Sequence, residues 1–177
     1  MKRFILTGTP GAGKTAILRQ LERDGVSVVE EAATDIIALE QAKGVAEPWK
    51  RPVFIDRIVE LQKQRQIRAA ALPDAIQFHD RSTVCTAALA DYLGFPPSAA
   101  LSRELERLAR NSIYQKCVFF VRTLGFVRPT DARRISQADA VRFEALHEKT
   151  YRAHGFELIP IEPGSVLDRV AAIRRAL

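Results

Sequence analysis

A glycine-rich loop near the start of the chain narrows the choice of folds more than any other segment does. Residues 8–15 read GTPGAGKT and match the pattern GxxxxGK[ST] at every fixed position. Glycines let the backbone turn so that successive N–H groups point inward, and the positive end of the following helix faces the same point. The motif therefore predicts a phosphate-binding P-loop. The alternative is a flexible glycine turn, which is disfavoured by the position of the motif between a predicted strand and a predicted helix.

The loop residues have expected roles toward a nucleotide. Lys14 is expected to face the β- and γ-phosphates, which also makes it a candidate catalytic residue, and the Thr15 hydroxyl is expected to ligate Mg²⁺. We therefore expect ATP and Mg²⁺ as cofactors. The expected nucleotide-binding residues are the loop and the residue after it, namely Gly8, Thr9, Pro10, Gly11, Ala12, Gly13, Lys14, Thr15 and Ala16.

Strand and helix patterns alternate along the rest of the chain. Short apolar runs predict strands at 3–7, 26–31, 75–80, 116–123 and 156–161. Apolar residues at helical spacing predict helices at 14–23, 31–44, 53–71, 82–94, 96–112 and 136–153, and one from residue 166. The alternation predicts an α/β fold, a three-layer α/β/α sandwich around a parallel sheet. A length of 177 residues fits one P-loop nucleotide-binding domain over 1–177.

Asp80 and Arg81 follow the predicted strand at 75–80, at the end where ligands of a parallel sheet gather. A carboxylate there holds Mg²⁺ through water in ATPases, whereas in small-molecule kinases an Asp-Arg pair there handles the acceptor's proton and faces phosphate. Both residues are candidate catalytic residues, and Asp80 and Thr15 are candidate metal ligands. The alternative for Asp80 is a cap on the next helix, and the two roles are compatible.

Two further acids, Glu30 and Glu31, end the predicted second strand at the same edge of the sheet. Adjacent strand residues point to opposite faces, so we expect only one of them to face the site. We favour Glu31, as a ligand of the acceptor hydroxyl or a water-mediated metal ligand. The alternative is that these acids stabilise the N-terminus of the next helix.

An arginine-bearing loop follows the predicted fourth strand. Arg133 and Arg134 are candidate catalytic residues and Arg128 a candidate substrate residue, in an expected lid over about 124–136. Arginines that close over a triphosphate exclude water and neutralise charge on the transferred phosphoryl group. The alternative is a solvated, basic start of a helix.

Arg57 is a weaker substrate candidate: it shares one face of the helix at 53–71 with Arg65, and a solvated face is the alternative.

Charge and composition bear on partners and location. The formal charge of +6 fits phosphate-bearing partners, although solubility alone also accounts for it. Nucleic acid is disfavoured as a partner, because the phenylalanines lie mostly in strands and core positions instead of among basic residues. No apolar run approaches the ~18 residues of a membrane span, and we expect a cytoplasmic protein with Cys85 and Cys117 as reduced core thiols. Its oligomeric state is left open between monomer and dimer.

Several segments together resemble one known family. They are FILTGTPGAGKT, VVEEAATDII, the PW-containing loop before a Gln- and Arg-rich helix, FHDRS, VRPTDARR and IEPGSVLDRV. Their combination is similar to the AAA-type ATPase/kinase family related to the kinase domain of ribosylnicotinamide kinase, over nearly the whole chain. The resemblance implies a kinase-type P-loop fold with strand order 2-3-1-4-5, and ATP and Mg²⁺ as ligands. It also implies roles for the P-loop residues, for Asp80 and Arg81, and for Arg133 or Arg134.

Two functions fit these observations. The first is an ATP-dependent phosphotransferase that acts on a nucleoside-like or other small hydroxyl acceptor. The second is an ATP-binding protein or ATPase that acts as a nucleotide-dependent switch. The chain carries no NKxD signature for reading guanine, which disfavours a GTPase of the usual type.

Overall fold

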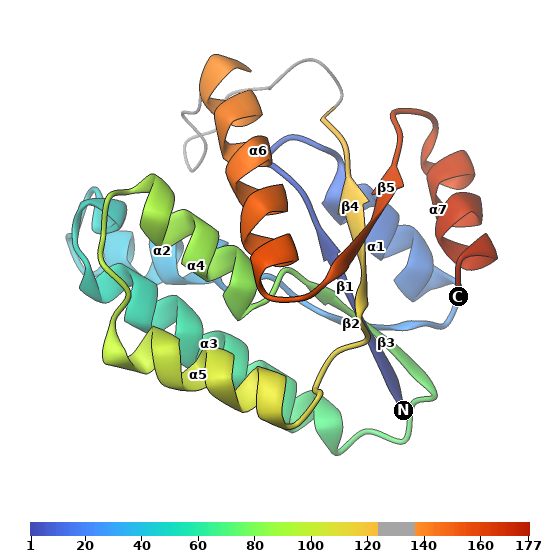
Figure 1. The fold of residues 1–177 in the computed structure, drawn as a ribbon, viewed down its shortest axis with the longest axis horizontal. Coiled ribbons are helices and arrows are strands. Elements are labelled where there is room, and N and C mark those ends of the chain that lie inside the picture. Colours follow the sequence, from blue (N-terminus) through green and yellow to red (C-terminus); the bar gives the residue numbers. More distant parts are fainter. Residues whose placement is uncertain (124–136) are drawn as a thin grey trace.

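Five parallel strands form the central sheet of this computed structural model, which describes residues 1–123 and 137–177 (Figure 1). The strands are β1 (Lys2–Thr7), β2 (Ser27–Val29), β3 (Ile76–Asp80), β4 (Cys117–Val121) and β5 (Glu157–Ile161). Their order across the sheet is β2-β3-β1-β4-β5, and each neighbouring pair is parallel. The predicted fold class and strand order are confirmed.

Helices cover both faces of this sheet, so the fold has three layers (Figure 1). One face carries α1 (Lys14–Arg23) and α7 (Val166–Arg175). On the other side lie α3 (Val53–Ala70), α4 (Thr83–Tyr92), α5 (Ala99–Arg110) and α6 (Gln137–Ala153), and α2 (Ala33–Ala42) packs against α3. The loop predicted between α2 and α3 contains a short 3-10 helix, η1 (Pro48–Lys50).

The alternation of side chains along β1 explains how the sheet joins the two layers. Phe4 and Leu6 pack with Ile17 and the rest of the α1 and α7 cluster, whereas Ile5 faces a cluster that includes Tyr151 of α6. All five side chains are buried. Because β1 is held on both faces, the loop that follows it starts from a fixed point.

A separate cluster joins the helices next to β2 and β3. Ile36, Phe54, Ile58 and Leu101 come from α2, α3 and α5, and they pack together in its centre. This cluster fixes α2 and α3 relative to α4, and therefore fixes the helical side of the cavities described below. Among the helices of residues 1–123 and 137–177, none has the length and apolar character that a membrane span needs.

Candidate functional site

The P-loop connects β1 to α1 and requires glycine at its first position. Gly8 has a φ of +137°, and a Cβ atom there would lie 2.3 Å from the backbone oxygen of Val121 on β4. No side chain fits in that space. At the other end of the loop, Gly13 caps α1 in the left-handed region, with a φ of +83°. The expected strand, glycine loop and helix are therefore all present.

Lys14 lies against the loop that it is expected to serve. Its Nζ atom donates to the backbone oxygens of Gly8, at 2.9 Å, and Thr9, at 3.0 Å, and the side chain is buried. Burial, aided by the nearby Arg81 guanidinium, lowers the pKa of Lys14 from its ordinary 10.5 to about 8. A bound phosphate would supply the opposite charge that this buried ammonium group favours.

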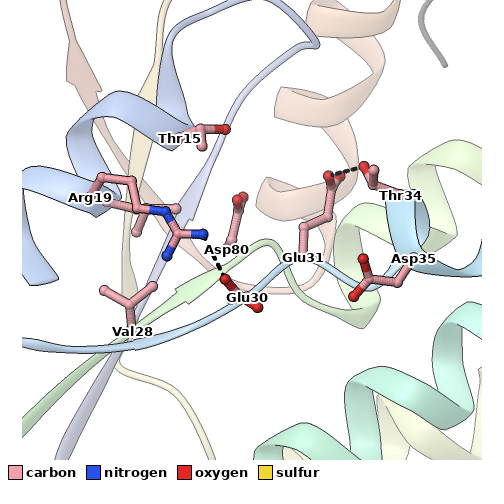
Figure 2. A pocket seen from close by; sticks show the side chains of 9 residues that line it. Thr15, Arg19, Val28, Glu30, Glu31, Thr34, Asp35 and Asp80 are labelled. Atoms are coloured by element: carbon pink, nitrogen blue, oxygen red, sulfur yellow. Dashed lines mark hydrogen bonds and ion pairs between the residues drawn. The ribbon is translucent and has the colours of Figure 1, made fainter. Parts of the chain in front are cut away.

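A cavity of about 240 Å³ opens beside the start of α1, where the P-loop ends (Figure 2). Thr15 stands at the side of α1, and the Asp80 carboxylate rises from the end of β3 into the same space. The complete lining is Thr15, Leu18, Arg19, Val28, Glu30, Glu31, Thr34, Asp35 and Asp80. The two predicted metal ligands therefore meet in one cavity, and their oxygen atoms suit Mg²⁺.

The positions of Glu30 and Glu31 differ from the prediction. β2 ends at Val29, so both acids lie in the connection to α2, where strand alternation no longer applies, and both line the smaller cavity. Glu30 is exposed and pairs with Arg19 at 2.7 Å. Glu31 accepts a hydrogen bond from the Thr34 hydroxyl at 2.8 Å, as Figure 2 shows. The expectation that only one of them faces the site was wrong.

Arg81 links the ends of β2 and β3. Its Nε atom lies 2.6 Å from Oε1 of Glu31, and its backbone N–H donates to the oxygen of Leu6 at 3.0 Å. Its φ of +70° is uncommon for a residue with a side chain. Burial alone would lower the pKa of Arg81, but Cys85, Glu31 and Asp80 raise it above its ordinary value.

A second, larger cavity of about 440 Å³ lies between α2, α3, α4 and α6. Its walls are mostly apolar and aromatic, and include Ile37, Trp49, Phe54, Ile58, Leu89, Tyr92, Leu93 and Phe143. Polar groups from Glu31, Gln62, Arg81, Thr86 and Asp139 also reach it. Such a combination of apolar walls with a few polar groups is typical of sites for small organic ligands. Pro10 of the P-loop is part of the lining, so this cavity lies next to the phosphate loop.

Glu31 and Thr34 line both cavities and therefore mark the place where they meet. The segment that carries Glu31 is braced by Arg65 of α3. Nη1 of Arg65 donates to the backbone oxygens of Glu30, at 3.1 Å, and Glu31, and Nη2 pairs with Asp35. Arg65 thus fixes the backbone beneath Glu31.

Arg57, the weaker substrate candidate, shares a face of α3 with Arg65, as its spacing predicts. Its guanidinium pairs with Glu40, a buried acid on α2, and Arg57 is absent from the lining of both cavities.

Arg128, Arg133 and Arg134, together with the expected lid over 124–136, lie outside the described residues. Within residues 1–123 and 137–177, no group of three or more His, Cys, Asp or Glu residues is arranged to hold a metal ion.

Sequence reasoning missed much of the larger cavity. Leu89, Tyr92 and Phe143 lie on helices, where an apolar residue that lines a cavity has the same pattern as one in the core. The contact between Thr34 and Glu31 did leave a signal, since Thr34 lies three residues after the acid at a predicted helix start. The bracing role of Arg65 left none, because its partners lie at least 30 residues away.

The strand order and the loop geometry are those of P-loop nucleotide-binding proteins, and this chain has the fold of that class. Residues 3–169 match the family described as the AAA domain, and the chain belongs to that family. The predicted family resemblance is confirmed. No curated protein matches the chain at a significant level.

Solved structures with the same fold include two kinds of protein. Deoxyadenosine kinase from M. mycoides with bound dATP aligns with a TM-score of 0.64 and 15% identity, over 98% of each chain. NadR protein in complex with NAD and AMP-PNP aligns with a TM-score of 0.71 and 18% identity, over 98% of this chain and 49% of NadR. This chain therefore spans about half of NadR, which has also been solved in complex with NR. At these identities the likeness shows the fold.

Proposed function

We propose that this protein is an ATP-dependent phosphotransferase that acts on a nucleoside-like or other small hydroxyl acceptor. The observation that carries the proposal is the position of Glu31. Its carboxylate lies where the cavity beside the P-loop meets the larger, apolar cavity, and it is held there by Arg81 and Thr34. A protein that only binds or hydrolyses a nucleotide needs the first cavity, whereas a kinase needs both.

The donor side follows from the P-loop. The backbone N–H groups of residues 8–15 and the N-terminus of α1 would bind the phosphates of ATP, and Lys14 would neutralise their charge. Thr15 and Asp80 are the residues that fit Mg²⁺, which supplies charge neutralisation at the β- and γ-phosphates when bound. The names of the solved neighbours support ATP as the donor, since they include complexes with dATP and AMP-PNP.

The acceptor side follows from the larger cavity. Trp49, Tyr92 and Phe143 offer aromatic surface to a flat ring, and such rings gain from stacking. Gln62 brings an amide to the same cavity, and its oxygen accepts a hydrogen bond from the Thr86 hydroxyl at 2.9 Å, which fixes the orientation of the amide. An apolar ring with polar edges, joined to a hydroxyl-bearing group, matches these walls.

Glu31 is the proposed general base. As the acceptor's hydroxyl oxygen attacks the γ-phosphorus and the bond to the β-phosphate oxygen breaks, Glu31 accepts the hydroxyl proton. Arg81, paired with Glu31 and next to Lys14, faces the charge that spreads over the transferred group. Asp80, which reaches only the smaller cavity, then serves the metal side instead of the acceptor.

The test is phosphoryl transfer from Mg·ATP to a panel of ribonucleosides, deoxyribonucleosides and nicotinamide riboside, with the products identified by mass spectrometry. We expect a phosphorylated product, and we expect Glu31→Gln to lower its rate of formation about 100-fold. Glu30→Gln is the matched control, since Glu30 has the same chemistry but does not reach the larger cavity. ATP hydrolysis that no acceptor accelerates, with no phosphorylated product, would favour the nucleotide-dependent switch.

A further inference from the structure

Cys85, His147 and Arg81 form a cluster, and the proposed phosphoryl transfer uses neither its thiol nor its imidazole. The Sγ atom of Cys85 lies 2.8 Å from Nε2 of His147 and 3.1 Å from Nη1 of Arg81. Cys85 belongs to α4 and His147 to α6, and Arg81 precedes α4. The fold thus places a thiol between an imidazole and a guanidinium.

The hydrogen bond made by the second ring nitrogen of His147 shows which nitrogen of the imidazole carries the proton. Nδ1 of His147 lies 3.2 Å from the backbone oxygen of Phe143, and a carbonyl oxygen can only accept a hydrogen bond. Nδ1 therefore carries the ring proton, and the lone pair of Nε2 faces Cys85. Burial, together with Arg81 and Lys14, lowers the pKa of His147 well below its ordinary value, which keeps the ring neutral at pH 7. The S–H group of Cys85 accordingly donates a hydrogen bond to Nε2.

The cluster opens onto a cavity. Cys85 and Arg81 both line the larger cavity, although only 4% of Cys85 is exposed. A small neutral reagent inside this cavity can meet the sulfur atom. Arg81 donates to the sulfur and stabilises negative charge there, and His147 accepts the proton that must leave. A guanidinium beside the sulfur favours the thiolate, which is the nucleophilic form of cysteine.

We propose that Cys85 is a modification site, a thiol that hydrogen peroxide oxidises to sulfenic acid within the larger cavity. In this step Nε2 of His147 takes the thiol proton, the sulfur attacks one peroxide oxygen, and the O–O bond breaks. The leaving hydroxide takes the proton back from His147, so that thiol and peroxide give sulfenic acid and water. The sulfur is oxidised by two electrons and the peroxide is reduced by two.

Oxidation at this position changes the site. The new oxygen occupies space in the cavity wall beside Arg81, whose guanidinium also holds Glu31. We expect it to obstruct the acceptor and to weaken the alignment of Arg81. This consequence for turnover rests on the proposed function, whereas the reactivity of the thiol does not.

The second cysteine provides an internal control. Cys117 is also a free cysteine and is more exposed than Cys85, and it packs against the apolar cluster of β1 and α1. Exposure alone therefore predicts that Cys117 reacts faster. We expect the reverse in the folded protein: in hydrogen peroxide with dimedone as the sulfenic acid trap, Cys85 is labelled about tenfold faster than Cys117. In urea the two rates should converge, because the cluster no longer exists.

One variant tests whether the reactivity of Cys85 depends on the imidazole of His147. His147→Gln should slow the labelling of Cys85 about tenfold and leave that of Cys117 unchanged, because the variant lacks the imidazole base. If that variant does not fold, the ratio of the two rates in the wild-type protein decides alone. Equal rates, or faster labelling of Cys117, would overturn the proposal. Labelling of Cys85 by peroxide without any effect on phosphoryl transfer would leave the thiol site intact and overturn only its effect on turnover.

Discussion

Nε of Arg81 and Oε1 of Glu31 lie 2.6 Å apart and join the segments that follow β3 and β2. Both side chains are mostly buried, with exposed fractions of 9% and 20%. Removing either partner would leave a largely desolvated charge without its main counter-charge, which is costly. The pair therefore holds the carboxylate at the junction of the two cavities, and its members are fifty positions apart in the sequence.

Asp80→Asn and Glu31→Gln should affect the reaction in different ways. Asp80 lines only the smaller cavity, with Thr15, whereas Glu31 also lines the larger one. We therefore expect Asp80→Asn to raise the Mg²⁺ concentration needed for half-maximal rate, by about tenfold, because a charged carboxylate becomes a neutral amide. Glu31→Gln should lower kcat at saturating Mg²⁺ and leave the Mg²⁺ requirement unchanged.

The measurement is a Mg²⁺ titration of phosphoryl transfer at saturating ATP and acceptor. If Asp80→Asn keeps a normal Mg²⁺ requirement but loses much of its kcat, Asp80 and not Glu31 is the general base. That outcome would restore the acceptor role that the sequence also allowed for Asp80.

Arg65→Met should impair catalysis although Arg65 is absent from the lining of both cavities. Arg65 donates to the backbone oxygens of Glu30 and Glu31, so its loss should loosen the segment that positions the base. We expect kcat to fall about tenfold with little change in the KM for ATP. Arg68→Met is the matched control, an exposed arginine one turn further along α3. Equal effects of both variants would mean that Arg65 does not position Glu31.

The fold was predictable because its signals are local. The glycines of residues 8–15, the short apolar strands and the amphipathic helices each lie within a few consecutive residues, and together they indicate a parallel sheet flanked by helices. The end of β2 was less predictable. The strand predicted over 26–31 extends past Val29, but pairing with β3 covers only Ser27–Val29, so both acids lie outside the strand.

The site was predictable only in part. The P-loop motif and the end of the strand at Asp80 are local sequence patterns. The two residues that they identify, Thr15 and Asp80, line the same cavity. The contact between Cys85 and His147 spans 62 positions and depends on how α6 packs on α4. A single sequence has no local pattern that encodes such a contact, which is why Cys85 was predicted only as a reduced core thiol.

Gly8→Ala should destabilise the protein far more than Gly25→Ala. Both glycines have positive φ, of +137° and +84°, so both variants pay a backbone cost of about 1 kcal/mol. Only at Gly8 would the new Cβ meet another atom, the Val121 oxygen at 2.3 Å, whereas at Gly25 nothing lies within 4 Å. We expect Gly8→Ala to lose roughly 3 kcal/mol or more in urea unfolding, and to lose ATP binding. Similar losses in both variants would show that the β4 contact has no special role.

Lys14→Met should reveal the cost of the buried ammonium group through pH. Burial lowers the pKa of Lys14 to about 8, against 10.5 ordinarily, so the unfolded chain binds its proton more tightly than the folded protein does. The resulting penalty is fully present below pH 8, and it disappears as pH rises from about 8 to 10.5. The wild-type protein should therefore gain up to about 3 kcal/mol relative to Lys14→Met over that window. Urea unfolding of both proteins at several pH values measures this difference, and other titrating groups cancel because both chains share them. A constant difference would mean that Lys14 titrates normally in the folded protein.

In the wild type alone, the affinity for ATP should decline above pH 8, because the neutral amine no longer attracts phosphate.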